Sequence, residues 1–230
     1  MTVNRSVLLD LDGTLTDPKI GITSSIRYAL DKLGEDVPPA NELTWCIGPP
    51  LLESFTKLVG QQRASRAIAY YRERFSTRGL YENRPYPGVR ELLSALSDSN
   101  TRLFVASSKP EVYVRRILEH FGFLTFFETV FGSTLDGLRA DKTDLLRFAL
   151  AEGKIPAADA TMVGDRRYDI VGARNNNISA IGVLYGYGSR QELAEAGAHA
   201  FAESPAALHR LLQSIGDAGP APAQNPGTTS

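Results

Sequence analysis

Short apolar runs alternate with amphipathic segments along most of the chain. The first run, at 7–11, is stopped by Gly13 and is typical of a buried strand that ends in a turn. The later part of the chain repeats this pattern and predicts strands at 102–106, 126–131, 160–163, 178–183 and 199–202, with helices at 89–96, 110–120, 141–151 and 166–175 and after Ser189 and Ser204. Strands that alternate with helices form a parallel sheet covered on both faces.

The segment between about 17 and 80 shows no strand pattern, but its apolar residues recur at helical spacing and predict helices at 21–33, 51–59 and 61–78. The stretch 81–88 contains two prolines and is typical of a linker. We therefore expect an α/β fold, a doubly wound parallel-sheet (Rossmann-like) core with an inserted α-helical cap. The expected division is a core at 1–16 and 86–216, a cap at 17–85 and a disordered tail at 217–230.

Composition narrows the class of protein. The 230 residues carry a net charge of -1, so no basic excess favours a nucleic acid polymer as partner. No apolar run approaches the roughly 20 residues of a membrane span, and the N-terminus does not fit a signal peptide, so we expect a cytoplasmic protein without a membrane partner. The single cysteine, Cys46, excludes an internal disulfide and is more typical of a small core residue than of a nucleophile. The oligomeric state is open.

Two acidic residues follow the first predicted strand. Ligands bind outside the carboxyl ends of the strands in open parallel sheets, and an extended backbone would point Asp10 and Asp12 the same way. Two like charges held close are costly unless a cation or a proton is shared. An Asx-type turn is the alternative interpretation, since Asp and Gly both favour turns.

Four later residues carry further candidate chemistry. Ser107 follows the strand at 102–106. Its hydroxyl is placed either to donate a hydrogen bond to a phosphate oxygen or to cap the next helix. Lys142 lies at a helix start, where the helix dipole disfavours a cation, so it either neutralises an anion or is a solvated surface lysine. Asp165 and Asp169 are four residues apart and share a face if a helix begins there; carboxylates at such a strand end suit Mg²⁺.

Together these positions resemble a known family. The string Asp-Leu-Asp-Gly-Thr at 10–14 resembles motif one of the haloacid dehalogenase superfamily of phosphatases. Ser107 matches the hydroxyl residue of motif two, with Ser108 as an alternative register, and Lys142 matches the lysine of motif three, with Arg139 as a weaker alternative. Gly-Asp-x-x-x-Asp at 164–169 resembles motif four, so the resemblance spans about residues 6–205.

The resemblance implies a role for each motif residue. Asp10 would attack phosphorus and form an aspartyl-phosphate, and Asp12 would act as general acid and base. The family's dehalogenases lack an aspartate at the place of Asp12, so phosphoryl chemistry is favoured. The implied phosphate and substrate contacts are Ser107, Lys142, Ser108, Thr14 and Gly48. The implied Mg²⁺ ligands are Asp10, the backbone carbonyl of Asp12, Asp165 and, directly or through water, Asp169.

The sequence indicates the substrate less clearly than it indicates the reaction. The segments 12–19, 132–137 and 182–189 look most like bacterial 5'-nucleotidases, with phosphoglycolate phosphatase as the alternative; a phosphomutase and a non-catalytic binding protein are less favoured. A 5'-nucleotidase or a phosphoglycolate phosphatase is expected to act on a small phosphorylated metabolite. The cap loop at 45–51 is either a specificity loop or a helix connection. Trp45, Phe55 or Tyr81 are candidates to stack on a base, and the Tyr-Gly-Tyr-Gly loop at 185–188, which lacks the spacing of a dinucleotide fingerprint, is placed to border the site.

Overall fold

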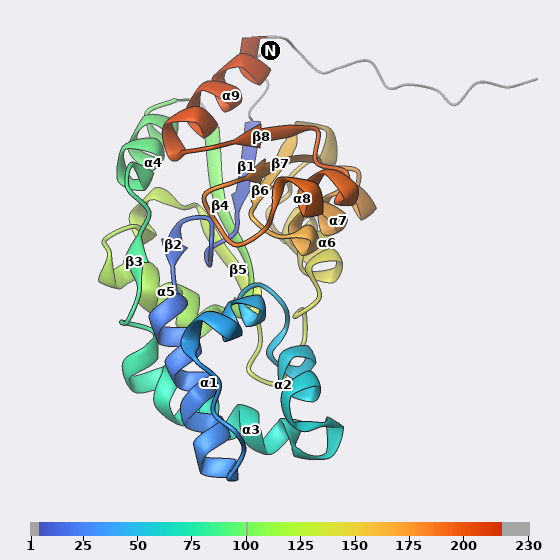
Figure 1. Cartoon of the computed structure of the whole chain (residues 1–230). Coiled ribbons are helices and arrows are strands. Elements are labelled where there is room, and N and C mark those ends of the chain that lie inside the picture. The colour runs from blue at the N-terminus through green and yellow to red at the C-terminus, as the bar shows by residue number, and fades with distance from the viewer. Residues whose placement is uncertain (1–4, 100, 218–230) are drawn as a thin grey trace, which may run out of the picture.

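The structure is a computed structural model that describes residues 5–99 and 101–217, built around one six-stranded parallel sheet (Figure 1). From edge to edge the strands are β5 (Thr129–Ser133), β4 (Thr101–Pro110), β1 (Arg5–Leu9), β6 (Ala160–Gly164), β7 (Ser179–Val183) and β8 (Ala200–Ala202). From β1 the chain goes first toward β4 and β5 and later toward β6, β7 and β8. The carboxyl end of β1 is therefore the switch point at which such sheets bind ligands.

Helices cover both faces of the sheet, as the alternating pattern predicts. Leu8 packs on one face with Met162, against α6 (Lys142–Glu152), α7 (Arg167–Asn175) and α8 (Arg190–Ala196). Val7 and Leu9 pack on the other face, against α4 (Val89–Ser97), α5 (Glu111–His120) and α9 (Pro205–Asp217). The predicted fold class, a doubly wound core with an inserted helical cap, is confirmed.

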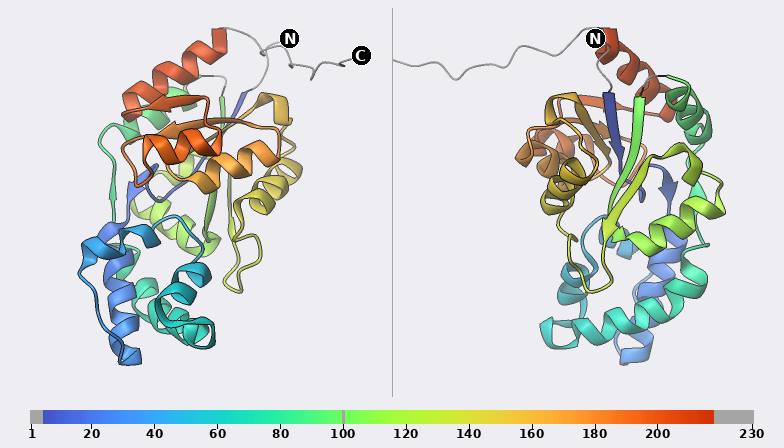
Figure 2. Two further views of the ribbon diagram at one scale, coloured as in Figure 1. Left: turned by 45° about the vertical axis from the view of Figure 1, so that its right-hand side comes forward. Right: turned by 180° about the vertical axis from the view of Figure 1, so that it is seen from behind.

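The cap is the helical block between the first strand and α4. It consists of α1 (Lys19–Leu33), the 3-10 helix η1 (Ala40–Cys46), α2 (Leu51–Val59), α3 (Gln61–Arg74) and the π-helical turn η2 (Phe75–Gly79). Both views in Figure 2 show these blue and cyan helices beyond one end of the sheet. Its interior is aromatic: Phe55 packs edge-on against Tyr71, which stacks on Phe75.

A short antiparallel ribbon joins the cap to the core. In it β2 (Thr16–Asp17) pairs with β3 (Arg84–Pro85), with Thr16 opposite Pro85 and Asp17 opposite Arg84. The sequence analysis treated 81–88 as a linker and did not predict this ribbon, because two-residue strands carry no readable periodicity. The ribbon lies at both expected domain boundaries, and those boundaries stay predictions.

Some element bounds differ from those expected. The prediction of a strand at 126–131 is partly wrong. Leu124–Phe126 forms the 3-10 helix η3, and the strand begins only at Thr129. The predicted helix at 61–78 is α-helical to Arg74 and continues without a break as the π-helical turn η2 to Gly79. A further turn, η4 (Ala157–Asp159), precedes β6. The expected tail at 217–230 lies outside the described residues, apart from Asp217 at the end of α9.

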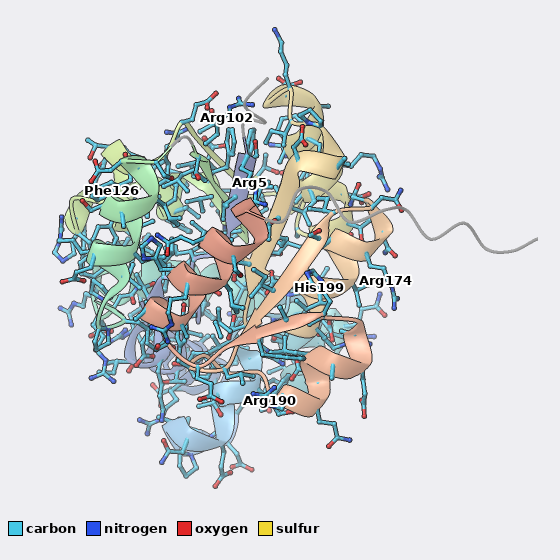
Figure 3. The ribbon with its side chains drawn as sticks, turned by 90° about the horizontal axis from the view of Figure 1, so that it is seen from above. Arg5, Arg102, Phe126, Arg174, Arg190 and His199 are labelled. Carbon is cyan, nitrogen blue, oxygen red and sulfur yellow. The ribbon has the colours of Figure 1, made fainter. Side chains whose placement is uncertain are left out.

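The end of the molecule opposite the cap is held by ordinary surface interactions. Figure 3 shows Arg5 and Arg102 at this end. Arg5 donates to the carbonyl of Leu212 at 2.8 Å, and Arg102 pairs with Glu128 at 2.6 Å. His199 precedes β8 and so lies at the amino ends of the strands, away from the switch point. Among the described residues, the group of three carboxylates that suits a cation lies at the other edge of the sheet, which faces the cap (Figure 1).

Candidate active site

The ends of three adjacent strands bring the candidate residues together. Leu9 of β1 lies opposite Val105 of β4 and Val163 of β6, and all three strands run parallel. The residues that follow, Asp10, Ser107 and Asp165, therefore meet at one edge. All three are buried, with 5%, 2% and 0% of their surface exposed.

The turn after Asp10 requires a glycine. Gly13 has a φ of 84°, in the left-handed region that L side chains rarely adopt. A Cβ at this position would also lie 2.1 Å from Oδ2 of Asp165. The glycine of the motif therefore lets the β1 turn approach the acidic residue at the end of β6.

Lys142 lies at the centre of the buried charges. Its Nζ is 3.0 Å from Oδ1 of Asp10, 2.7 Å from Oδ1 of Asp169 and 2.8 Å from the carbonyl oxygen of Ala106. Burial alone would lower the pKa of Lys142, but the carboxylates of Asp10 and Asp169 outweigh it and raise that pKa, so the ammonium stays charged. Arg139, the weaker alternative, instead stacks on Phe148 with its guanidinium 4.3 Å from the ring centre.

Three buried carboxylates form a group that suits a cation. One oxygen each from Asp10, Asp165 and Asp169 lies within 4.8 Å of the others. Oδ2 of Asp165 accepts a hydrogen bond from the backbone N–H of Tyr187 at 2.8 Å, whereas Oδ1 is buried without a hydrogen-bond partner. Burial and the neighbouring carboxylates raise the pKa of Asp165. An orphaned carboxylate oxygen among acidic neighbours fits Mg²⁺, which prefers oxygen ligands.

Asp169 has a second contact that fixes its orientation. Its Oδ2 accepts from the backbone N–H of Arg166 at 3.1 Å, as the third residue of a capping box at the start of α7. The helix begins at Arg167, so Asp165 lies just before it rather than on its face as the four-residue spacing predicted. The two carboxylates meet because the turn, not the helix, directs Asp165 inward.

Asp12 is paired with a residue that the sequence analysis missed. Nζ of Lys109 lies 2.8 Å from Oδ1 and 2.5 Å from Oδ2 of Asp12. Burial raises the pKa of Asp12, and the Lys109 ammonium opposes that rise only in part. The available signal was the position of Lys109 two residues after Ser107, at the end of the same strand. The Asp12 carboxylate lies outside the three-carboxylate group, and its carbonyl as a metal ligand stays a prediction.

The other predicted substrate contacts differ in whether they line the cavity. Ser107 is buried, Ser108 is half-buried, and both line the same cavity, so the register stays open. Gly48 also lines this cavity, beside the side chain of Arg166. Thr14 does not line it, and its buried hydroxyl has no hydrogen-bond partner, so its predicted substrate contact stays untested.

The cavity lies between the strand ends and the cap, with a volume of about 70 Å³. Asp10, Asp12, Lys142 and Asp169 form its core side, while the cap and α5 contribute apolar and aromatic residues: Ile22, Cys46, Pro49, Pro50, Leu51, Tyr71, Phe75 and Tyr113. Trp45, Phe55 and Tyr81, the aromatic residues singled out from the sequence, do not line it. Phe55 is buried in the cap, and Trp45 and Tyr81 are 39% and 43% exposed.

Arg166 joins the two sides of the cavity and was also missed. Its Nη1 donates to the carbonyl oxygen of Ile47 in the cap, and its Nε donates to Glu192 at 3.0 Å. Arg166 occupies one of the unspecified positions of the Gly-Asp-x-x-x-Asp string, so the motif gave no signal for it. The loop at 45–51 therefore contacts the core beside the active site.

Comparison with known proteins agrees with this geometry. A family model described as haloacid dehalogenase-like hydrolase matches residues 7–183. A 5'-nucleotidase of Pseudomonas aeruginosa is 45% identical over 211 residues, which cover 91% of this chain and 96% of that protein. Tyrosine-protein kinase PtkA of Mycobacterium tuberculosis is 42% identical over 182 residues, which cover 79% of this chain and 62% of that protein.

A solved structure has the same architecture. The crystal structure of a predicted phosphatase from Clostridium acetobutylicum superposes with a TM-score of 0.89 at 43% identity and covers 92% of this chain and 99% of that one. Among the described helices, none has the length and apolar character that crossing a membrane requires. Since the family model spans the four motif segments whose side chains meet at the switch point, this chain belongs to the haloacid dehalogenase-like hydrolases and is a phosphatase.

Proposed function

We propose that the chain hydrolyses phosphate monoesters through an aspartyl-phosphate, depends on Mg²⁺ and prefers nucleoside 5'-monophosphates. The observation that carries the chemistry is the buried Asp10, which pairs with Lys142 and lies in one group of carboxylates with Asp165 and Asp169. Phosphoryl transfer needs positioning and charge neutralisation more than any other contribution, and this arrangement supplies both.

The metal would be held by Asp10 and Asp165, with Asp169 as a direct or water-mediated partner. Bound Mg²⁺ neutralises negative charge on the phosphoryl oxygens and the nucleophile. Asp165 supports this assignment because its Oδ1 has no other partner and its Oδ2 is held by Tyr187.

In the first step a carboxylate oxygen of Asp10 attacks phosphorus as the bond to the leaving oxygen breaks. Asp12 gives its proton to that oxygen, so the alcohol leaves neutral. The raised pKa of Asp12 favours the protonated form that this step needs. Lys142 and Ser107 hold the phosphoryl oxygens during the transfer.

In the second step water attacks the phosphorus of the aspartyl-phosphate. Asp12, now ionised, takes a proton from that water, and the bond between phosphorus and the Asp10 oxygen breaks. Inorganic phosphate leaves and both aspartates return to their starting states. One carboxyl group thus serves as acid and then as base.

The cap side of the cavity supports an uncharged leaving group with a flat face. Tyr71 stacks on Phe75 with ring centres 5.1 Å apart, and both line the cavity. Besides Lys142, the cations that line the cavity are already paired: Lys109 with Asp12, and Arg166 with Glu192. A nucleoside, which carries no second anionic group, suits this wall. At about 70 Å³ the cavity has room for about five waters, so a nucleotide requires the cap to move outward.

Phosphoglycolate is the second candidate, and the small cavity is the observation that favours it. Its carboxylate would need a cation besides Lys142. Lys109 or Arg166 would have to exchange a present partner for that carboxylate, which costs the existing ion pair.

The test is phosphate release with Mg²⁺ from nucleoside 5'-monophosphates, phosphoglycolate, sugar phosphates and an aryl phosphate. We expect the highest kcat/KM for nucleotides. A preference for phosphoglycolate would replace the substrate assignment but keep the chemistry. Failure to hydrolyse any of them, with Mg²⁺ present, would contradict the proposed function.

A further inference from the structure

The Tyr-Gly-Tyr-Gly loop after β7 packs directly on the candidate metal site. A Cβ at Gly186 would lie 2.3 Å from the carbonyl oxygen of Gly13 and 2.4 Å from Cβ of Asp165. A Cβ at Gly188 would lie 2.0 Å from the carbonyl oxygen of Asp165. Because both positions lack a side chain, the loop backbone lies against the turns that follow β1 and β6.

Tyr187, between these glycines, makes two hydrogen bonds in different directions. Its backbone N–H donates to Oδ2 of Asp165 at 2.8 Å. This bond occupies one carboxylate oxygen and leaves Oδ1 without a partner. The loop therefore determines which oxygen of Asp165 is available to a cation.

The side chain of the same residue is bound to the ribbon that carries the cap. The hydroxyl of Tyr187 donates to Oδ1 of Asp17 in β2. Asp17 also accepts from Nη2 of Arg84 in β3 at 2.9 Å and from the backbone N–H of Lys19 at 3.1 Å. Tyr187 is thus held at its hydroxyl by the cap ribbon and contacts Asp165 through its backbone.

We propose that Tyr187 is a positioning residue that fixes the orientation of the Asp165 carboxylate for the metal, anchored by its hydroxyl bond to Asp17. The inference rests on the proposed function, because it assumes that Asp165 binds Mg²⁺. Hydrogen bonds that orient a metal-binding carboxylate commonly change metal affinity 10- to 100-fold when they are lost. The anchor also links the metal site to the base of the cap.

The decisive variant is Tyr187→Phe, which keeps the ring and the backbone N–H and removes only the bond to Asp17. We expect the dissociation constant for Mg²⁺, measured by calorimetry without substrate, to rise about tenfold. The Mg²⁺ concentration that gives half-maximal activity should rise by the same factor, while kcat at saturating Mg²⁺ returns to the wild-type value. Because Mg²⁺ also stabilises the folded state of a weakened protein, thermal unfolding without Mg²⁺ should show that Tyr187→Phe is folded before its affinity is compared.

The matched control is Tyr185→Phe in the same loop. The hydroxyl of Tyr185 is buried without a hydrogen-bond partner, and its ring packs edge-on against Tyr86 at 5.1 Å. Its removal should leave the Mg²⁺ dissociation constant unchanged. Asp17→Ala, which removes the acceptor, should weaken Mg²⁺ as much as Tyr187→Phe, and the double variant should bind no worse than either single variant.

Unchanged Mg²⁺ affinity in Tyr187→Phe, or equal weakening in Tyr185→Phe, would overturn the inference and leave the proposed function intact. If the wild-type protein binds no Mg²⁺, or Asp165→Asn binds it equally well, the metal assignment itself fails. If Tyr187→Phe does not fold, Asp17→Ala decides the question by the same calorimetric readout when compared with Arg84→Ala, which removes the other side-chain partner of Asp17 and should leave the Mg²⁺ dissociation constant unchanged.

Discussion

The two sides of the active-site cavity are built from different chemistry. The core side, formed by Asp10, Asp12, Lys142 and Asp169, consists of charged groups in ion pairs with exposed fractions below 10%. The cap side, which we call the cap wall and define as Ile22, Cys46, Tyr71 and Phe75, carries no charged side chain.

This difference separates reaction from recognition. The charges of the core side come from the turn after β1 and from the first turns of α6 and α7, whose positions the sheet fixes. The cap wall offers only apolar and aromatic surface, so it contributes to the choice of leaving group. Lys109 lies where the two sides meet, because it pairs with Asp12 while its ammonium is 4.9 Å from the ring centre of Phe75. The predictions below test this division.

Asp10→Asn is expected to have the largest effect, because it removes the nucleophile of the core side. The rate of phosphate release should fall by about 10³-fold or more. The exposed Asp144→Asn is the control and should retain full activity. Thermal unfolding should show both variants folded, and substantial activity in Asp10→Asn would contradict the nucleophile assignment.

Lys142→Met tests the charge balance of the core side. It leaves Asp10 and Asp169 buried without their cation, so the free energy of unfolding should fall by about 3–5 kcal/mol without metal. Mg²⁺ should restore part of that loss, because it neutralises the same carboxylates. Chemical denaturation with and without Mg²⁺ measures both effects. Lys57→Met, in an exposed pair, should leave stability almost unchanged and should not respond to Mg²⁺.

Lys109→Met tests the residue between the two sides. Asp12 would lose its ion pair but keep its position on the turn after β1. We therefore expect kcat to fall by about 10- to 100-fold, which is less than the full contribution of a general acid. The loss should be similar for every substrate in the panel, because Asp12 serves each leaving group. A loss confined to phosphoglycolate would instead assign Lys109 to substrate binding.

The sequence contained enough information for the core side because its signals are local. A strand followed by a turn places Asp10 and Asp165 at known positions, and the parallel order of three strands brings them together. For Lys142 the position at a helix start left a surface role open, and the resemblance to motif three identified it. The prediction for the two aspartates needed only the direction of each strand.

The cap wall and the ion-pair partners depend on packing between distant segments. Tyr71 was read only as part of a helix, and whether a helical aromatic faces the cap interior or the cavity depends on how the whole cap sits on the core. Lys109 and Arg166 occupy positions where the motifs specify nothing. The ribbon of β2 and β3 was missed because its strands are too short to have a period.

Tyr71→Leu tests the cap wall. It removes a cavity-lining ring that would stack on the base of a nucleotide, and an aromatic pair of that kind is worth about 0.5–1.5 kcal/mol, so kcat/KM for nucleotides should fall up to about tenfold. Phosphoglycolate and small sugar phosphates should be affected less, because they offer no flat face. An equal loss for all substrates would show that the cap wall supports the reaction itself rather than selection.

The smallest expected effect concerns Cys46, the thiol on the cap wall. Burial raises the pKa of Cys46 to about 12, whereas an unfolded thiol titrates near 8.5. Between these values the unfolded chain loses a proton that the folded chain keeps, so the free energy of unfolding should decrease as pH rises above about 8.5. Cys46→Ala should lack this contribution, so chemical denaturation at pH 7.5 and 9.5 should show a smaller decrease in its free energy of unfolding.

Alkylation of Cys46 by iodoacetamide gives a second measurement, because the chain has one cysteine. At pH 8.5 the reaction should be slow in the folded protein and fast in denaturant. Fast alkylation of the folded protein would show that the cap wall opens to solvent far more often than its 2% exposure of this thiol indicates.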